Sequence, residues 1–256
     1  MTDGTIDYGE RGRVVVLPDA RSLAQHAAEL LRDLTREVVA DRANAYIALS
    51  GGSTPKAMGA ILGAQPMRDE VPWGSLHVFW GDERWAPIDS PDSNAGEALR
   101  GYLDSVPIPR SQVHPFETSG DPAESAANYE RLIKTVVPGS PMPMFDLILL
   151  GMGDDGHTAS LFPGTAALSI TDRLVTENRV EKLNATRLTF TAPLINAARH
   201  VAFLVTGAGK AERLAQVLDG PQDPMQLPSQ LVRPTHGQLT WLVDKAAAAN
   251  LAREPR

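Results

Sequence analysis

The chain has 256 residues, of which 43% are hydrophobic and 21% charged, a composition that is ordinary for a globular protein. It has no cysteine, which excludes disulfides and thiolate nucleophiles, and its formal net charge of −7 argues against nucleic acid or an anionic membrane as a partner. No apolar run approaches the ~18 residues that a membrane-spanning helix needs. The first 13 residues lack the apolar core of a signal peptide, so we expect a cytoplasmic protein.

Short β-rich runs alternate with helical patterns along the whole chain. The predicted strands cover 13–18, 45–49, 76–80, 144–150, 187–191, 200–206 and 238–243. The predicted helices cover 20–38 after an N-cap at Asp19, 54–62, 94–106, 123–137, 193–199 and 210–218. This alternation predicts an α/β fold with a mainly parallel sheet and helices on both faces. We expect one domain over 1–256, with a flexible segment over 1–12.

Four of these strands end in polar or glycine-rich loops. They are "SGGSTPK" after 45–49, "GDERW" after 76–80, "GMGDDGH" after 144–150 and "TGAGK" after 200–206. Ligands of parallel sheets bind outside the carboxyl ends of the strands. If the strands are parallel, the four loops meet at one edge and form a candidate site.

Three of the loops carry groups that suit an anion. Gly51, Gly52, Ser53 and Thr54 offer amides and hydroxyls at a helix start, although a plain capped turn explains them equally well. Lys210 in "TGAGK" could reach the same anion, but taken alone it is more typical of a solvated lysine. A Walker A loop is absent.

The loop "GDERW" places three charged residues directly after a buried strand. Arg84 is suited to bind a phosphate or carboxylate through its forked guanidinium. The alternative is an ion pair between Arg84 and a neighbouring acid, with Glu83 as the partner. Asp82 is a further candidate for the site.

The sequence "GMGDDG" in the third loop has the spacing of a dinucleotide-binding turn, but we reject that interpretation. Asp154 and Asp155 would repel a pyrophosphate, and Pro163 and Gly164 interrupt the chain too early for a crossover helix. The catalytic interpretation is better. His157 is predicted at the start of a short helix, whose N-terminus would keep the imidazole neutral and basic, with Asp155 fixing its tautomer.

Other hydrolytic machinery is missing from the sequence. It contains neither a G-x-S-x-G nucleophile elbow nor histidines at metal-ligand spacing, so we expect no metal. A lone base can activate water only against a reactive electrophile, such as an activated ester or a lactone.

These motifs, with "ALSGGSTPK", "FWGDERW", "LILLGMGDDGHTASLFPG" and "LPSQLVRP" among them, closely resemble the 6-phosphogluconolactonase family over residues 14–245. The resemblance implies a Rossmann-like fold similar to that of glucosamine-6-phosphate deaminase. It also implies hydrolysis of 6-phospho-D-glucono-1,5-lactone in the oxidative pentose phosphate pathway, without a cofactor. His157 resembles the general base of the family, with Asp155 beside it. Arg84 and Lys210, helped by "GGST" and by Arg187, resemble its phosphate ligands.

Two alternatives remain open. A glucosamine-6-phosphate deaminase has a glutamate just before the proline that follows its D-G-H turn, whereas this chain has Phe162 before Pro163. In such an enzyme Asp82 could serve as the base. A non-catalytic sugar-phosphate sensor would share the fold, but the intact Asp155 and His157 argue against it. The sequence does not reveal any obligate protein partner.

Overall fold

The computed structural model describes residues 4–253 and has two sheets. The strands are β1 (Gly4–Asp7), β2 (Arg13–Leu17), β3 (Ala45–Leu49), β4 (Leu76–Trp80), β5 (Asp82–Arg84), β6 (Leu147–Gly151), β7 (Val175–Val180), β8 (Ala185–Phe190), β9 (His200–Val205) and β10 (Gln238–Asp244). The larger sheet has the order β1-β2-β10-β9-β6-β3-β4, and every pair in it is parallel except β1 with β2. The prediction of a mainly parallel sheet is confirmed.

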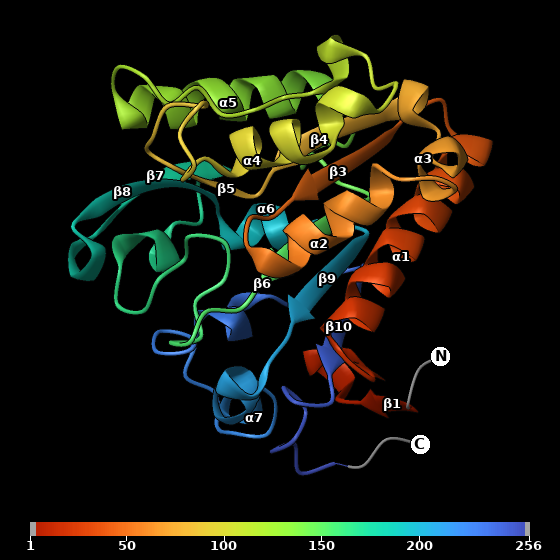
Figure 1. The fold of residues 1–256 in the computed structure, drawn as a ribbon. Coiled ribbons are helices and arrows are strands. Elements are labelled where there is room, and N and C mark those ends of the chain that lie inside the picture. The colour runs from red at the N-terminus through yellow and green to blue at the C-terminus, as the bar shows by residue number, and fades with distance from the viewer. Residues whose placement is uncertain (1–3, 254–256) are drawn as a thin grey trace.

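Seven α-helices lie in the described part of the chain. They are α1 (Ala20–Asp41), α2 (Ser53–Leu62), α3 (Met67–Glu70), α4 (Asn94–Gly101), α5 (Pro122–Val136), α6 (Ala192–Asn196) and α7 (Ala211–Leu218). Asp19 caps α1 as predicted, since its Oδ1 accepts a hydrogen bond from the Ser22 amide at 2.7 Å. Figure 1 shows α1 alongside the larger sheet and α5 over the small sheet of β5, β8 and β7.

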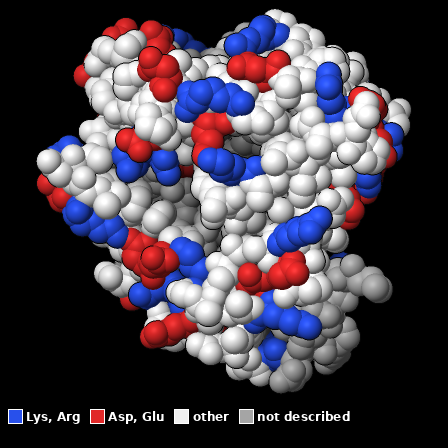
Figure 2. Space-filling view, in the orientation of Figure 1, with Lys and Arg blue, Asp and Glu red and all other residues white. Residues whose placement is uncertain are grey.

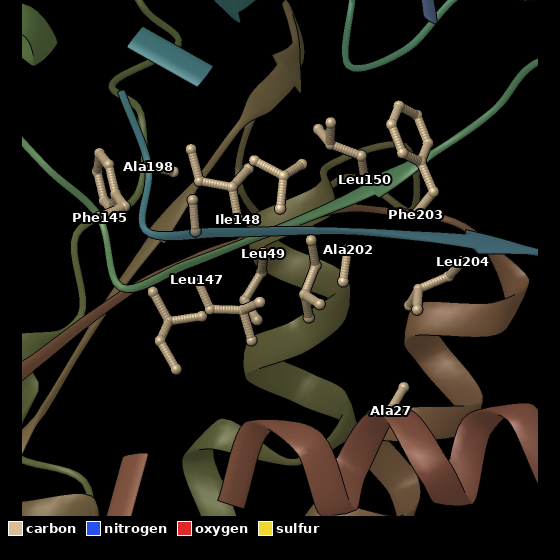
Figure 3. Close-up of a cluster of buried hydrophobic side chains, with 14 of the residues drawn as sticks. Ala27, Leu49, Phe145, Leu147, Ile148, Leu150, Ala198, Ala202, Phe203 and Leu204 are labelled. Carbon is tan, nitrogen blue, oxygen red and sulfur yellow. The ribbon is translucent and has the colours of Figure 1, made fainter. Parts of the chain in front are cut away.

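The core forms on both faces of the parallel sheet because successive strand residues point in opposite directions. In Figure 3, Ala202 and Leu204 of β9 point toward α1, and Phe203 points to the other face. All three are nearly inaccessible to solvent. A strand buried on both faces must be apolar throughout, which is why β6 and β9 were recognisable as continuous apolar runs.

The predicted strand over 187–191 is found as part of β8, and it pairs antiparallel with β5 and β7 in a separate sheet. The N-terminal segment, however, is not a flexible tail over residues 4–12. Its strand β1 pairs with β2, and Ile6 and Tyr8 are buried. Residues 1–3 of that prediction lie outside the described residues.

Candidate active site

The four predicted loops meet at the carboxyl edge of the parallel sheet, since β3, β4, β6 and β9 all run in the same direction. A cavity of about 520 Å³ opens there. Its lining comprises Ser50, Gly51, Asp82, Arg84, Asn94, Gly151, Met152, Gly153, Asp154, Asp155, His157, Ala159, Ser160, Phe162, Lys182, Leu183, Arg187 and Lys210. The convergence expected from the sequence is therefore found.

His157 and Asp155 form a hydrogen-bonded pair in this cavity. The His157 Nδ1 lies 2.6 Å from the Asp155 Oδ1, and the His157 amide donates to the same oxygen at 3.1 Å. Because a carboxylate only accepts, Nδ1 carries the proton and Nε2 is left with a free lone pair. Within the described part of the chain, no group hydrogen-bonds to Nε2. The ring is therefore oriented as a base would need to be.

The helix predicted at His157 is absent. Residues 152–165 form turns and an isolated bridge between Thr158 and Leu161, so no helix N-terminus acts on the imidazole. Instead, the His157 ring packs against the backbone of the same loop at Gly153. A Cβ atom on Gly153 would lie 2.0 Å from the His157 Nδ1, so this position must be glycine. The third residue of the G-x-G pattern thus makes room for the imidazole rather than for a pyrophosphate.

Burial, not a helix dipole, is the main cause that keeps His157 neutral. Its ring stacks on Phe162 with centroids 4.1 Å apart, and its side chain is only 28% exposed. Desolvation lowers the pKa of His157 to about 4; Lys210 and Arg187 act in the same direction, whereas Asp82 and Asp154 oppose it. The imidazole is therefore unprotonated at neutral pH.

Asp82 lines the cavity and is fixed in place by its neighbours. The Ser160 hydroxyl donates to its Oδ2 at 2.7 Å, and the Asn94 amide side chain donates to its carbonyl at 3.0 Å. Asn94 in turn packs so closely on Gly51 that a Cβ atom there would lie 1.8 Å from the Asn94 Oδ1. Gly51 thus allows the first loop to pack against the start of α4, which Asn94 links to Asp82 in the second loop.

Glu83 has a structural role that differs from the expected ion pair with Arg84. Its carboxylate is 1% exposed and accepts hydrogen bonds from the amides of Arg84, Asn94 and Ala95 and from the Ser93 hydroxyl, at 2.7–3.0 Å. Burial raises the pKa of Glu83, and the three amides counteract that rise. The side chain fastens β5 to the first turn of α4.

Arg84 and Arg187 face each other across two strands. They are direct partners in the antiparallel register of β5 and β8, and both line the cavity. Burial lowers the pKa of Arg187, and the nearby charge of Arg84 lowers it further. Like charges directly opposite each other destabilise a sheet, so an anion bound between them would be stabilising. The pair is therefore a candidate anion-binding feature of the cavity.

Lys210 reaches the cavity from the fourth loop. Its Nζ lies 2.5 Å from the Asp154 Oδ1, and this contact lowers the pKa of Asp154. The fourth loop is fixed to the end of β10, because both carboxylate oxygens of the buried Asp244 accept a hydrogen bond from the Gly207 amide at 3.0 Å. Lys210 is thus available to an anion if it exchanges its contact with the exposed Asp154.

The "GGST" motif contributes less than predicted. Of its four residues only Gly51 lines the cavity. Gly52 borders a smaller hollow beside it, Ser53 faces solvent, and the Thr54 hydroxyl is 3.0 Å from that of Thr206. The Thr54 side chain therefore ties the start of α2 to the end of β9 rather than offering its hydroxyl to a ligand.

Sequence reasoning missed four polar side chains of the cavity: Ser50, Asn94, Ser160 and Lys182. Lys182 lies in the turn between β7 and β8, and its Nζ forms an ion pair with the Asp155 Oδ2. In the sequence it stands in "VEKLNATR", which is typical of a solvated turn. Only the pairing of β7 with β8 places that turn over the cavity.

Charged groups are mixed on the surface, so the cations of the cavity are a local feature. On the face shown in Figure 2, acidic and basic side chains are interspersed. Among residues 4–253, no cluster of three or more histidines, cysteines or acids could hold a metal ion. No helix in that range is long and apolar enough to cross a membrane.

Comparison with known proteins gives the family. The family described as glucosamine-6-phosphate isomerases/6-phosphogluconolactonase matches residues 18–241. The chain belongs to this family. Within the family, a 6-phosphogluconolactonase from Synechocystis is 45% identical over 93% of this chain and 98% of its own length. One from Mycobacterium tuberculosis is 38% identical over 93% of this chain and 98% of its own length.

Solved structures of the family share the fold. The 6-phosphogluconolactonase from Trypanosoma brucei superimposes with a TM-score of 0.82 at 30% identity, covering 93% of this chain and 98% of that chain. A monomeric glucosamine-6-phosphate deaminase, at 22% identity, reaches a TM-score of 0.77 over 93% of this chain and 99% of its own. The deaminase likeness concerns the fold alone.

Proposed function

We propose that this protein hydrolyses 6-phospho-D-glucono-1,5-lactone to 6-phosphogluconate, and that it does so in the cytoplasm. The observation that carries the proposal is the His157–Asp155 pair, whose free Nε2 shares one cavity with the Arg84–Arg187 pair. The proposal is supported by the two groups lining one cavity, where they could serve as a base for water and a site for a phosphate, and by membership of a family that contains lactonases of that name.

In the proposed reaction His157 acts as the general base. Its Nε2 takes a proton from water as the water oxygen attacks C1 of the lactone. The tetrahedral intermediate collapses when the bond between C1 and the ring oxygen breaks, and the imidazolium returns the proton to that oxygen. The product is the open-chain acid, which loses a proton to solvent. A histidine of low pKa forms a strongly acidic imidazolium, which favours the second transfer.

The phosphate is proposed to lie between Arg84 and Arg187, with Lys210 as a further ligand. The two guanidinium groups can each donate two hydrogen bonds to phosphate oxygens, whereas a lysine acts as a point charge. Because Arg84 and Arg187 come from the small sheet and Lys210 from the fourth loop, the phosphate would also connect that sheet with the fourth loop. Asp82 would remain near the reacting end with Ser160.

The test is a direct comparison of two substrates. Purified protein is given 6-phosphogluconolactone, and release of 6-phosphogluconate is measured above the spontaneous rate. In parallel it is given glucosamine 6-phosphate, and ammonia release is measured. Lactone hydrolysis without ammonia release is expected. Ammonia release alone would replace the proposal with the deaminase function, and activity on neither compound would favour a sugar-phosphate sensor.

A further inference from the structure

Lys182 contacts both groups that surround the His157 ring. Its Nζ forms an ion pair with the Asp155 Oδ2, and the Asp155 Oδ1 accepts the hydrogen bond from the ring. The same Nζ lies 5.1 Å above the centre of the Phe162 ring, on which the imidazole stacks. One ammonium group thus touches the carboxylate and the aromatic ring that orient the imidazole.

The local fold explains how a turn residue reaches this place. Lys182 lies in a single 3-10 turn, Glu181–Leu183, between the paired strands β7 and β8. The turn closes at Asn184, which adopts the left-handed conformation with φ of 46° and accepts a hydrogen bond from Arg179. The hairpin that supplies Arg187 to the cavity therefore also supplies Lys182.

We propose that Lys182 is a positioning residue of the reaction, holding the Asp155 carboxylate against the His157 ring and keeping that ring neutral. Only the expected change in kcat rests on the proposed function. The expected change in the His157 titration is a property of the protein without substrate. Removing the ammonium leaves the charge of Asp155, which is hydrogen-bonded to the ring, uncompensated. This change favours the imidazolium.

Several other charged groups face His157 and remain when Lys182 is changed. They are Asp154 and Asp155 from its own loop, Asp82 and Arg84 from β5, Arg187 from β8 and Lys210 from the fourth loop. Asp155 keeps the hydrogen bonds from the amide and the Nδ1 of His157 to its Oδ1, but it loses the ion pair that holds its Oδ2. A change at Lys182 therefore removes one charge and one support of the Asp155 carboxylate, while the other charged groups stay the same.

An ordinary surface ion pair would behave differently. The Lys182 side chain is 51% exposed, and exposed ion pairs contribute little to stability. Lys182→Met should therefore leave the melting temperature nearly unchanged. It should nevertheless shift the His157 titration upward by about 0.5–1 pH unit, as expected for the loss of one charge near a part-buried ring.

The experiment uses three variants of the full chain: Lys182→Met, Lys182→Arg and, as a matched control, Lys134→Met. Lys134 makes a comparable ion pair with Glu130 on α5, away from the cavity. The His157 titration is followed by NMR of histidine-labelled protein, with the signal assigned by its loss in His157→Gln. The acid limb of kcat against pH is measured on 6-phosphogluconolactone.

We expect Lys182→Met to raise the His157 titration and the acid limb together and to lower kcat about tenfold with little change in KM, and Lys182→Arg to restore both. Unchanged titration in Lys182→Met would overturn the inference. So would a rise in KM alone, which would make Lys182 a substrate ligand, or a loss of activity that follows the melting temperature and is not restored by arginine. If wild type and control have no lactonase activity, the proposed function fails, and the NMR titration still decides the inference.

Discussion

His157 is held by its neighbours in one orientation. Asp155 fixes the Nδ1 proton, and Phe162 covers one face of the ring. His157→Ala removes the proposed base, so kcat should fall by ~10²–10⁴ while KM changes little. The loop lies at the edge of the sheet, so circular dichroism and the melting temperature should match wild type. Near-wild-type turnover in the folded variant would exclude His157 as the base.

The pH dependence of activity follows from the same side chain. A general base works only when neutral, and burial lowers the pKa of His157 to about 4. Activity should therefore persist as the pH falls through 6.5, where an ordinary histidine becomes protonated, and decline only toward pH 4. The measurement is kcat/KM between pH 4 and 8, with circular dichroism at each pH. An acid limb centred near 6.5 in folded protein would contradict this expectation.

The paired arginines make a prediction about substrate choice. Each charge-assisted hydrogen bond to phosphate contributes roughly 1.5–3 kcal/mol, so Arg84→Ala or Arg187→Ala should lower kcat/KM on the phosphorylated lactone by ~10–150-fold. Lys210→Ala should have an effect in the same direction. Activity on plain gluconolactone should change far less, because that substrate lacks the phosphate.

A matched control for these variants is Arg131→Ala, which changes an exposed arginine of α5 outside the cavity. It should leave kcat/KM unchanged on both lactones. If Arg84→Ala or Arg187→Ala loses activity equally on both lactones, the changed residue does not bind phosphate, and it acts instead at the carbonyl or through the fold.

At the scale of elements, the joint between β5 and α4 depends on Glu83. Its buried carboxylate accepts four hydrogen bonds from the strand and from the start of the helix. Glu83→Gln replaces one accepting oxygen with a donor that would face amide hydrogens. Unsatisfied buried groups cost about 1–3 kcal/mol each, so the free energy of unfolding should fall by ~2–4 kcal/mol in urea titrations.

Glu97→Gln on the same helix provides the comparison. Glu97 makes an ion pair with Lys56 at 2.9 Å and is 32% exposed. Its replacement should cost less than ~1 kcal/mol, as is typical of exposed pairs. Equal destabilisation by the two variants would show that Glu83 has no special role at this joint.

The strands that could be predicted most directly are those in which nearly every residue is buried, on both faces of the sheet. The inner strands β6 and β9 are buried on both faces and therefore read as unbroken apolar runs. Strand β7, "VTENRV", has four polar residues of six, and β5 has only three residues, all charged. Such strands exist because of their partners, β8 for both, and a single sequence does not reveal that pairing.

The same limit applies to the site. His157, Asp155, Arg84 and Lys210 follow parallel strands, so the rule for strand ends placed them correctly. Arg187 was known only through the family resemblance. The position of Lys182 depends on the hairpin of the small sheet, which was not foreseen. The predicted helix at His157 failed because a close-packed glycine turn, rather than an N-terminal amide array, supports the ring.

At the scale of the whole molecule, an acidic protein is proposed to bind a phosphorylated substrate. The net charge of −7 repels a dianion at long range, but salt screens that repulsion beyond about 8–10 Å. The cations that line the cavity act within that distance, from strands and loops whose positions are fixed by the two sheets. Affinity therefore depends on the fold that brings Arg84, Arg187 and Lys210 together, not on the overall charge.

The whole molecule is also expected to lose stability in mild acid. Burial lowers the pKa of His77, His114, His157 and His200, to about 4 for His114 and His157. The His77 Nδ1 and the His114 Nε2 share one hydrogen bond of 3.0 Å, and each ring also contacts an aromatic neighbour. In the unfolded chain these rings take up protons near pH 6.5, whereas in the folded protein they remain neutral.

The sign of the effect follows from proton binding. Between pH 6.5 and about 4 the unfolded chain binds more protons than the folded one, so the free energy of unfolding must fall as the pH falls through this window. Above pH 6.5 the stability contributed by the neutral histidines is complete. The melting temperature should accordingly be flat from pH 8 to 7 and drop from pH 6.5 to 4.5. His114→Gln removes one of the buried titrating rings, so its melting temperature should depend less steeply on pH than that of wild type. A melting temperature that stays constant between pH 6.5 and 4.5, or an equal slope in the variant, would show that these histidines are not the groups that couple folding to pH.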